Sequence, residues 1–205
     1  MVREKEMLTK YIFVGIIFAV ILQRLFELRI SKNNETYILN QGGKKHSDNL
    51  LTTVKVLQIS WWIAAVAEVW YFNRPFIFPL ATIALLVTLA GQVLRYLSMQ
   101  ALEQHWTLPI MTLPNTPVVD KGVYFYLRHP NWLGVILEIA ALPLIHGAYL
   151  TAIIFSLANA VLMSQRIQTE EQALAKNSNY TLVFANRPRF IPKISFLSQE
   201  ISGDS

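Results

Sequence analysis

Two groups of polar and ionisable side chains border short apolar segments in the C-terminal half of the chain. The first is residues 128–134, with the sequence RHPNWLG, preceded by Tyr124; the second is Arg166 followed by Glu170 and Glu171. Charged side chains next to membrane-type sequence are costly to bury, so they usually serve a function. An Arg can hold a carboxylate through two hydrogen bonds, and a Glu can accept hydrogen bonds from ribose hydroxyls. We therefore take these two groups as the candidate site.

The first group allows two interpretations. Pro130 fits the first turn of a helix, where its missing N–H costs nothing. The N–H groups of residues 131–133 would then form a place for a carboxylate or another anion. Alternatively, Arg128 and His129 anchor the chain at the membrane interface and face lipid headgroups.

The second group also has a structural alternative. Arg166 and Glu170 lie four residues apart, so on a helix they share one face and can pair with each other for a few tenths of a kcal/mol. This helix follows directly from an apolar hairpin, and we expect it to pack back near the first group. Four more polar residues lie inside apolar segments, and they either pair among themselves or line a cavity: Gln23, Arg24, Glu27 and Glu68.

Composition indicates a membrane protein. Hydrophobic residues make up 53% of the 205 residues and charged residues only 15%, whereas a soluble domain carries about 25% charged residues. The chain has no cysteine, which excludes disulfides, thiolate metal sites and a cysteine nucleophile, and its four histidines show no metal-ligand spacing. The net charge of +5 comes from Lys and Arg in loops. Because these form no concentrated basic face, we predict no nucleic-acid partner.

The apolar runs predict an all-α fold, a multi-pass transmembrane helical bundle of about five membrane helices. Three runs are long enough to cross a hydrocarbon core of about 30 Å: residues 11–30, 54–71 and 76–97. Two shorter runs, residues 132–144 and 149–163, predict a helical hairpin.

The segments between these runs complete the prediction. Residues 31–53 are polar and contain a Gly-Gly pair, which indicates a loop. Residues 98–131 form a long segment with four prolines, and its aromatic and aliphatic content favours an ordered, functional structure. Residues 165–175 predict an amphipathic helix, and residues 177–205 a polar tail.

Basic residues predict the orientation of the bundle. One side of the bundle carries more of them than the other. Eleven lie in or beside residues 31–55, residues 98–131 and the segment after the last apolar run: Lys32, Lys44, Lys45, Lys55, Lys121, Arg128, Arg166, Lys176, Arg187, Arg189 and Lys193. The opposite side has only Arg3, Lys5, Lys10 and Arg74. By the positive-inside rule the side with eleven faces the cytoplasm, with the N-terminus outside. Both polar groups then lie on the cytoplasmic face, so we expect a cytoplasm-facing cofactor site in an integral membrane protein. The membrane is the cell membrane in a bacterium and the endoplasmic reticulum in a eukaryote.

Residues 113–192 resemble the isoprenylcysteine carboxyl methyltransferase family. Several elements match in order and spacing, which is far more specific than any one of them: Val118-Val119, residues 121–124 (KGVY), residues 128–134 (RHPNWLG), Arg166 with Glu170-Glu171, Tyr180 and residues 187–192 (RPRFIP). In two respects the chain departs from the family pattern: Trp132 stands where Tyr is usual, and the chain is short, with fewer N-terminal helices than the eukaryotic members.

The resemblance implies one methyltransferase domain, residues 1–205, with N-terminal membrane helices (1–100) and a catalytic, cofactor-binding region (101–195). It implies an S-adenosyl-L-methionine-dependent O-methyltransferase acting on a lipophilic acceptor, either the carboxylate of a prenylated cysteine or a similar lipid-like carboxyl or hydroxyl group. Arg166 would face the acceptor. The residues implied for cofactor binding are Pro117, Val118, Val119, Tyr124, His129, Pro130, Asn131, Trp132 and Glu170, with no metal.

Two other functions stay open at this point. A membrane reductase of the sterol-reductase type carries a similar RHPNY-like motif but uses NADPH, and it would need further basic side chains for the 2′-phosphate. A non-catalytic lipid-binding bundle would bind no nucleotide-like cofactor. For the methyltransferase, the expected partners are membrane lipids and a lipophilic small molecule or prenylated substrate.

Overall fold

Helices make up nearly all of the regular structure of this protein. The structure is a computed structural model and describes residues 2–48, 50–114 and 116–191. The long helices are α1 (Val2–Asn40), α2 (Leu51–Tyr71), α3 (Phe78–Leu102), α4 (Pro130–Ala141) and α5 (Tyr149–Asn177). The short elements are η1 (Glu103–His105), η2 (Gly122–Phe125), η3 (Leu142–His146), α6 (Tyr180–Phe184) and the antiparallel strands β1 (Lys44–Lys45) and β2 (Met111–Thr112).

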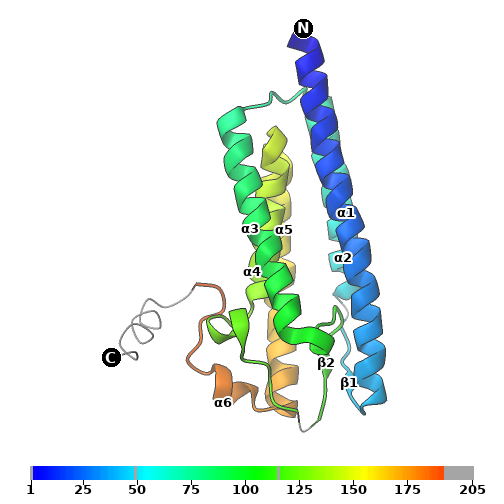
Figure 1. The fold of residues 1–205 in the computed structure, drawn as a ribbon, viewed down its shortest axis with the longest axis vertical. Helices are drawn as coiled ribbons and strands as arrows, with labels where there is room; N and C mark the ends of the chain where they lie inside the picture. The colour runs from blue at the N-terminus through cyan, green and yellow to red at the C-terminus, as the bar shows by residue number, and fades with distance from the viewer. Residues whose placement is uncertain (1, 49, 115, 192–205) are drawn as a thin grey trace, which may run out of the picture.

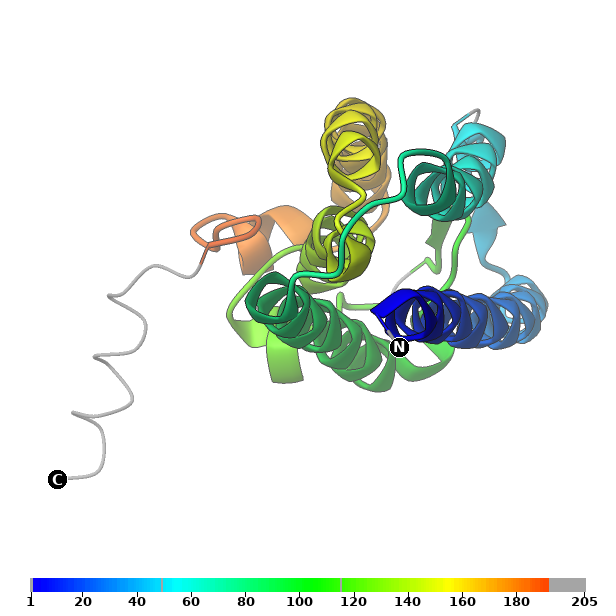
Figure 2. The same ribbon diagram turned by 90° about the horizontal axis from the view of Figure 1, so that it is seen from above.

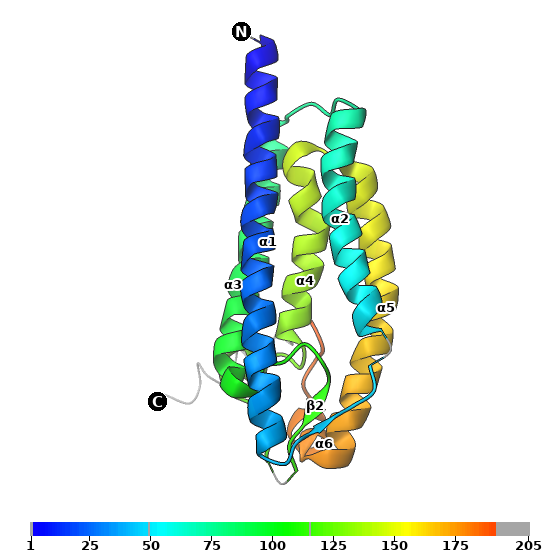
Figure 3. The same ribbon diagram turned by 90° about the vertical axis from the view of Figure 1, so that its right-hand side faces the viewer.

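The long helices lie side by side along the long axis of the molecule (Figures 1 and 3). Seen from above, α4 lies between α3 and α5, and α2 lies next to α5 (Figure 2). The start of α1 lies at one end of the bundle, whereas α6 and the two short strands lie at the other (Figure 3). We call the end with α6, β1 and β2 the site end.

The main apolar core lies away from the site end. It joins the first half of α1, the second half of α2 and the end of α4 with η3. Its largest fully buried members are Phe13, Trp61, Ile139 and Leu142. This core fixes the helices relative to one another and leaves the site end to more polar contacts.

Two glycines allow α3 and α4 to pack closely. A Cβ atom at Gly91 would lie 2.8 Å from the carbonyl oxygen of Gly134, and a Cβ at Gly134 would lie 2.6 Å from Cγ of Arg95. Both distances are shorter than van der Waals contact, so a side chain at either position would push the helices apart. The glycine that ends the RHPNWLG sequence therefore makes room for the neighbouring helix and for the stem of Arg95.

The described residues contain three helices that are long and apolar enough to cross a membrane: Glu4–Asn40, Phe78–His105 and Tyr149–Asn177. The unit formed by α4 and η3, Pro130–His146, is a shorter apolar helix, and α2 runs alongside the others (Figure 3). The mostly helical fold is confirmed. That α2 and the α4–η3 unit also span the bilayer stays a prediction.

The predicted loop at residues 31–53 is wrong for its first ten residues, because α1 continues to Asn40. Contacts with the segment that follows α3 stabilise this extension. Asn34 Nδ2 donates hydrogen bonds to the carbonyl oxygens of Glu103 (3.1 Å) and Trp106 (2.8 Å), and Ser31 Oγ accepts one from the Leu108 N–H (2.8 Å). At 39 residues, α1 is about 58 Å long, since an α-helix rises 1.5 Å per residue.

The C-terminal hairpin is formed as predicted, but its second arm is longer. The turn lies at Gly147, whose φ of 68° suits glycine. The apolar run 149–163 and the predicted amphipathic helix 165–175 are one continuous helix, α5. The predicted tail is described as far as Ile191 and contains α6; Pro192 and the residues after it lie outside the described residues.

Candidate functional site

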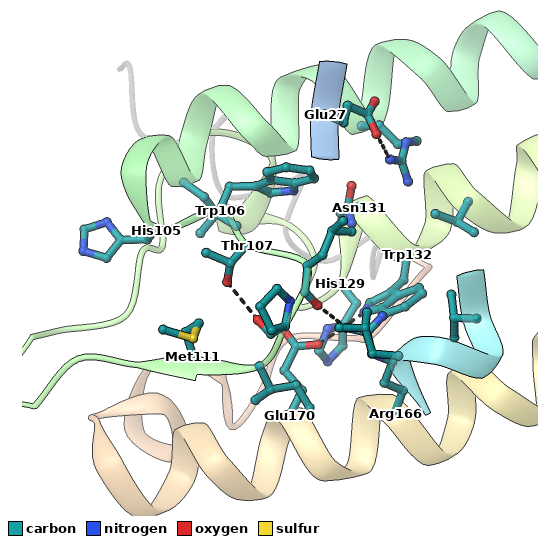
Figure 4. Close-up of a pocket in the computed structure, with 18 of the residues that line it drawn as sticks. Glu27, His105, Trp106, Thr107, Met111, His129, Asn131, Trp132, Arg166 and Glu170 are labelled. Carbon is teal, nitrogen blue, oxygen red and sulfur yellow. Dashed lines mark hydrogen bonds and ion pairs between the residues drawn. The ribbon is translucent and has the colours of Figure 1, made fainter. Parts of the chain in front are cut away.

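A cavity of about 400 Å³ opens at the site end of the bundle. Nine of the ten residues predicted for the site line it: Pro117, Val118, Val119, Tyr124, His129, Asn131, Trp132, Arg166 and Glu170. The tenth, Pro130, is buried as the first residue of α4, as predicted from its fixed φ. Figure 4 shows Arg166 and Glu170 on α5 directed toward Trp132 and Asn131 at the start of α4.

The C-terminal segment holds the RHP sequence in place. The backbone N–H of Arg128 donates to the carbonyl oxygen of Pro188 (3.0 Å), and that of His129 donates to Arg189 (3.2 Å). The side chain of Arg128 also donates through Nε to the carbonyl oxygen of Arg187 (2.6 Å). The tail residues and the RHP sequence therefore fold as one unit at the entrance of α4.

Glu171 is the centre of this unit. Its carboxylate lies 3.0 Å from Nε2 of His129, accepts two hydrogen bonds from Arg189 (3.1 and 2.7 Å) and one from the Tyr180 hydroxyl (3.4 Å). Burial, together with the Glu171 charge, raises the pKa of the Tyr180 phenol, so it stays a donor. His129 is buried and paired, which excludes the interpretation that it is an anchor facing lipid headgroups.

Glu170 faces the cavity instead. Its Oε2 accepts a hydrogen bond of 3.2 Å from the indole Nε1 of Trp132. Burial, reinforced by the Glu170 charge, raises the pKa of the Tyr124 phenol, so Tyr124 contributes a neutral ring to the cavity wall. The apolar residues 117–119 complete this wall, and the backbone of Val118 is held by Asn179 Oδ1 (2.9 Å).

Arg166 does not pair with Glu170, so the structural alternative, in which these two residues pair within the helix, does not hold. Its Nε donates to Asp48 Oδ2 at 2.9 Å, its Nη2 donates to the carbonyl oxygen of Leu108, and its guanidinium lies 5.2 Å from the ring centroid of Trp132. Glu170 instead accepts the hydrogen bond from the indole N–H of Trp132, and Asp48 forms the ion pair with Arg166. Both members of this ion pair are about 5% exposed.

A second group of charges borders the cavity deeper in the bundle. Glu27 Oε2 lies 2.5 Å from both Arg24 Nη1 and Arg95 Nη2, and Arg24 also pairs with Glu138. Gln23 donates to Glu27 Oε1 at 3.0 Å. Both predicted alternatives hold for Arg24 and Glu27, since they pair with other side chains and also line the cavity. The network joins α1, α3 and α4.

Glu68 has a different role at the opposite end. Its carboxylate accepts hydrogen bonds from the backbone N–H groups of Leu150 (3.1 Å) and Thr151 (2.7 Å), and from Arg74 (3.1 and 2.8 Å). These N–H groups belong to the first turn of α5, where a carboxylate is favoured. Glu68 therefore ties α2 to the start of α5 and is far from the cavity.

Sequence reasoning missed Asp48 and Arg95. Asp48 lies in a polar segment 118 residues before Arg166, and no local pattern singles it out. Arg95 had a signal that could have been used, because it is a charged residue inside an apolar run, four residues after Gly91. A charge at this depth is a candidate functional residue on cost alone.

The cavity fits a ligand that is part apolar and part polar. Residues 117–119 and Tyr124 offer an apolar wall, and Glu170 offers a carboxylate. Three polar atoms on lining residues are buried without a hydrogen-bond partner in the described part of the chain: Trp62 Nε1, Arg95 Nε and Asn131 Oδ1. Unsatisfied buried polar atoms are costly, so they indicate a bound group or ordered water at this wall.

Comparison with known proteins identifies the family. The model of the isoprenylcysteine carboxyl methyltransferase family matches residues 82–176, which include α4, the cavity-lining part of α5 and most of α3. The chain belongs to the isoprenylcysteine carboxyl methyltransferase family. The match confirms the resemblance over residues 113–176 and extends it back into α3.

The relatives of this methyltransferase-family chain include both bacterial and eukaryotic proteins. It is 34% identical to the uncharacterised protein YpbQ of Bacillus subtilis over 164 residues, which is 80% of this chain and 96% of the relative. It is 26% identical over 166 residues to an uncharacterised protein of Haemophilus influenzae, again 80% and 96%. It is 32% identical over 86 residues to the protein-S-isoprenylcysteine O-methyltransferase of Schizosaccharomyces pombe, which is 41% of this chain and 36% of that protein.

The fold of the family is also shared. The structure of the eukaryotic intramembrane Ras methyltransferase ICMT superposes on 70% of this chain with a TM-score of 0.57 and 23% sequence identity. The aligned part is 53% of that chain, so this family member spans about half of the eukaryotic enzyme. The apolar helices and the shared fold make this member of the isoprenylcysteine carboxyl methyltransferase family an integral membrane protein.

Proposed function

We propose that this protein is an S-adenosylmethionine-dependent O-methyltransferase acting on a lipophilic acceptor: the carboxylate of a prenylated cysteine or a similar lipid-like carboxyl or hydroxyl group. The observation that carries the proposal is the cavity lined by nine of the ten predicted residues, in a member of the isoprenylcysteine carboxyl methyltransferase family. Residues 117–132 and Glu170 would hold the cofactor, and Arg166 would hold the acceptor.

The cofactor would be bound by the walls described above. When bound, S-adenosylmethionine supplies a methyl group activated by a positively charged sulfur. Glu170 would accept hydrogen bonds from the ribose hydroxyls, and the ring of Tyr124 with residues 117–119 would contact the adenine. Asn131 Oδ1 and Arg95 Nε, which lack partners within the described residues, would meet polar groups at the amino-acid end. His129 would act indirectly, because its contact with Glu171 fixes the start of α4.

Arg166 would orient the acceptor oxygen. A carboxylate acceptor with a pKa near 4 is already ionised at neutral pH and needs no general base. A phenol or enol with a pKa near 10 is mostly protonated, and a neighbouring guanidinium would stabilise its anion. The chain's contribution is then to hold the acceptor in line with the methyl group and to exclude water, and positioning of this kind can supply much of a rate enhancement.

The acceptor would enter sideways from the bilayer between α1 and α2. Leu25 and Leu28 of α1 and Ile59 of α2 line the cavity. The same three side chains are also exposed on the outside of the bundle, by 57%, 39% and 54%. Side chains that border both the cavity and the lipid-facing surface mark the edge of a lateral opening suited to an apolar tail. The polar cofactor would enter from the site end, which we place in the cytoplasm.

The test is methyl transfer by the purified protein in detergent or lipid vesicles. Tritiated S-adenosylmethionine would be offered with a prenylated-cysteine analogue and, in parallel, with a long-chain phenol. We expect label in the lipid phase with at least one acceptor, and the comparison assigns the acceptor class. Absence of transfer to both acceptors by folded protein would contradict the proposal.

A further inference from the structure

The residue that holds Arg166 comes from a part of the chain outside the matched family region. Asp48 lies between β1 and α2, whereas the family match covers residues 82–176. Its side chain is about 5% exposed, as is that of Arg166. A buried carboxylate beside the Arg166 guanidinium affects both the position of the guanidinium and the local net charge. We propose that this guanidinium holds the acceptor.

The Arg166 guanidinium is held on several sides. Asp48 accepts from Nε at 2.9 Å, the Leu108 carbonyl oxygen accepts from Nη2, and the ring of Trp132 covers one face at 5.2 Å. These contacts leave Nη1 as the nitrogen without a described hydrogen bond to the protein. A planar fork fixed in this way directs its remaining N–H groups, whereas a loosely held side chain would have to be ordered by the substrate.

Asp48 is itself fixed by the local fold. Its second oxygen, Oδ1, accepts a hydrogen bond of 3.2 Å from the Leu50 N–H, two residues on, which forms a turn just before α2. The segment before it is tied to the long loop, because His46 N donates to the Ile110 carbonyl oxygen (2.9 Å) and its Nε2 lies 2.7 Å from Thr112 Oγ1. One carboxylate oxygen therefore serves the turn, and the other serves Arg166.

We infer that Asp48 is a positioning residue of the reaction: it fixes the Arg166 guanidinium through Nε so that Nη1 is directed at the acceptor oxygen. This inference rests on the proposed function. It assigns a catalytic consequence to a loop that the family match does not cover. Because Asp48 also carries a negative charge, it lowers the attraction of Arg166 for an anionic acceptor. Asp48 therefore improves the orientation of the Arg166 guanidinium but weakens the binding of the acceptor.

The experiment compares Asp48→Asn with wild type in methyl transfer and in S-adenosylhomocysteine binding. Asn keeps an oxygen that can accept the hydrogen bond from the Leu50 N–H. It loses the negative charge that faces Arg166. We expect kcat to fall about ten- to a hundredfold, while the KM of a carboxylate acceptor stays the same or falls. The affinity and stoichiometry of S-adenosylhomocysteine should be unchanged. Asp48→Glu, which keeps the charge but shifts the pair, should also lower kcat, and it decides the matter if the Asn variant does not fold.

Lys45→Gln is the matched control in the same segment. It removes the exposed ion pair between Lys45 and Glu35 and leaves Asp48 in place, so turnover should stay near wild type. A double variant, Asp48→Asn with Arg166→Lys, should be little slower than Arg166→Lys alone, because both changes disturb one group.

Three results would overturn the inference. They are full turnover in Asp48→Asn, independent multiplication of the two losses in the double variant, and loss of S-adenosylhomocysteine binding capacity in step with turnover. The last would show that Asp48 serves the fold alone. A wild-type protein that methylates no acceptor would instead refute the proposed function, and the inference with it, so the two failures are distinguishable.

Discussion

Arg166 presents a guanidinium to the cavity with two of its nitrogen atoms already bonded to the protein. Substitution Arg166→Lys keeps a positive charge that can still pair with Asp48, but it removes the planar fork. We expect kcat to fall roughly ten- to a hundredfold, with S-adenosylhomocysteine affinity nearly unchanged because Glu170 and residues 117–132 remain. Steady-state kinetics with the preferred acceptor, beside calorimetry, provide the measurement.

The alternative at this position is a purely structural ion pair between Arg166 and Asp48. A lysine could maintain such a pair, so that alternative predicts nearly normal turnover for Arg166→Lys. An active enzyme that keeps full turnover in this variant would show that Arg166 has no role in the reaction.

The sequence predicted a site residue where its neighbours in the sequence mark it as one. The RHPNWLG sequence, Tyr124, Arg166 and Glu170 could be selected because charges next to apolar runs are costly, and because their order matches a family. Asp48 could not be selected, since its importance comes only from a contact with a residue 118 positions away. The partner of Arg166 likewise depends on tertiary structure, because the fold places Asp48 beside Arg166 and Trp132 beside Glu170.

At the scale of the elements, the close packing of α3 against α4 places one wall of the cavity. Substitution Gly134→Ala would add a Cβ 2.7 Å from the backbone carbonyl oxygen of Gly91 and 2.6 Å from Cγ of Arg95. Overpacking of this kind costs about 1–3 kcal/mol. We expect a lower thermal unfolding midpoint in detergent and weaker S-adenosylhomocysteine binding, because Arg95 and Asn131 would both be displaced.

Gly15→Ala is the matched control for this prediction. Gly15 lies in α1, and a Cβ there would meet nothing within 4 Å. The control should leave both the midpoint and the affinity unchanged. If Gly134→Ala behaves like Gly15→Ala, the two helices can separate freely, and their close packing does not position the site.

The apolar runs predicted the helices, but they did not predict where the helices end. Hydropathy placed the centres of α1, α2, α3 and the α4–η3 unit, because the cost of exposing apolar surface acts on the whole run. The extension of α1 to Asn40 depends on hydrogen bonds from Ser31 and Asn34 to the segment after α3. Contacts of that kind leave no mark in local composition, and the same holds for the two-residue pairing of β1 with β2.

For the whole molecule, the distribution of Lys and Arg predicts the N-terminus outside and the site end in the cytoplasm. Because the chain has no cysteine, single cysteines can report on each side. Tyr71→Cys marks the end of α2 and Leu182→Cys marks α6; these side chains are 84% and 85% exposed. In intact cells, an impermeant maleimide should label Tyr71→Cys directly and Leu182→Cys only after permeabilisation.

The reverse labelling pattern would place the cavity mouth on the wrong side for a cytosolic cofactor. Labelling of both cysteines from outside would contradict an odd number of spans between Tyr71 and Leu182. It would therefore contradict the interpretation that α2 and the α4–η3 unit cross the bilayer together with the three longer helices.

The most direct test of the central claim is the binding of S-adenosylhomocysteine to the purified protein, measured by calorimetry with NADPH in parallel. We predict saturable binding of S-adenosylhomocysteine at one site per chain and no binding of NADPH. Glu170→Ala should weaken the affinity at least tenfold, whereas Glu103→Gln, at an exposed ion pair with Lys121, should leave it unchanged. Binding of NADPH in place of S-adenosylhomocysteine would contradict the account and favour a reductase, and binding of neither would favour a lipid-binding bundle.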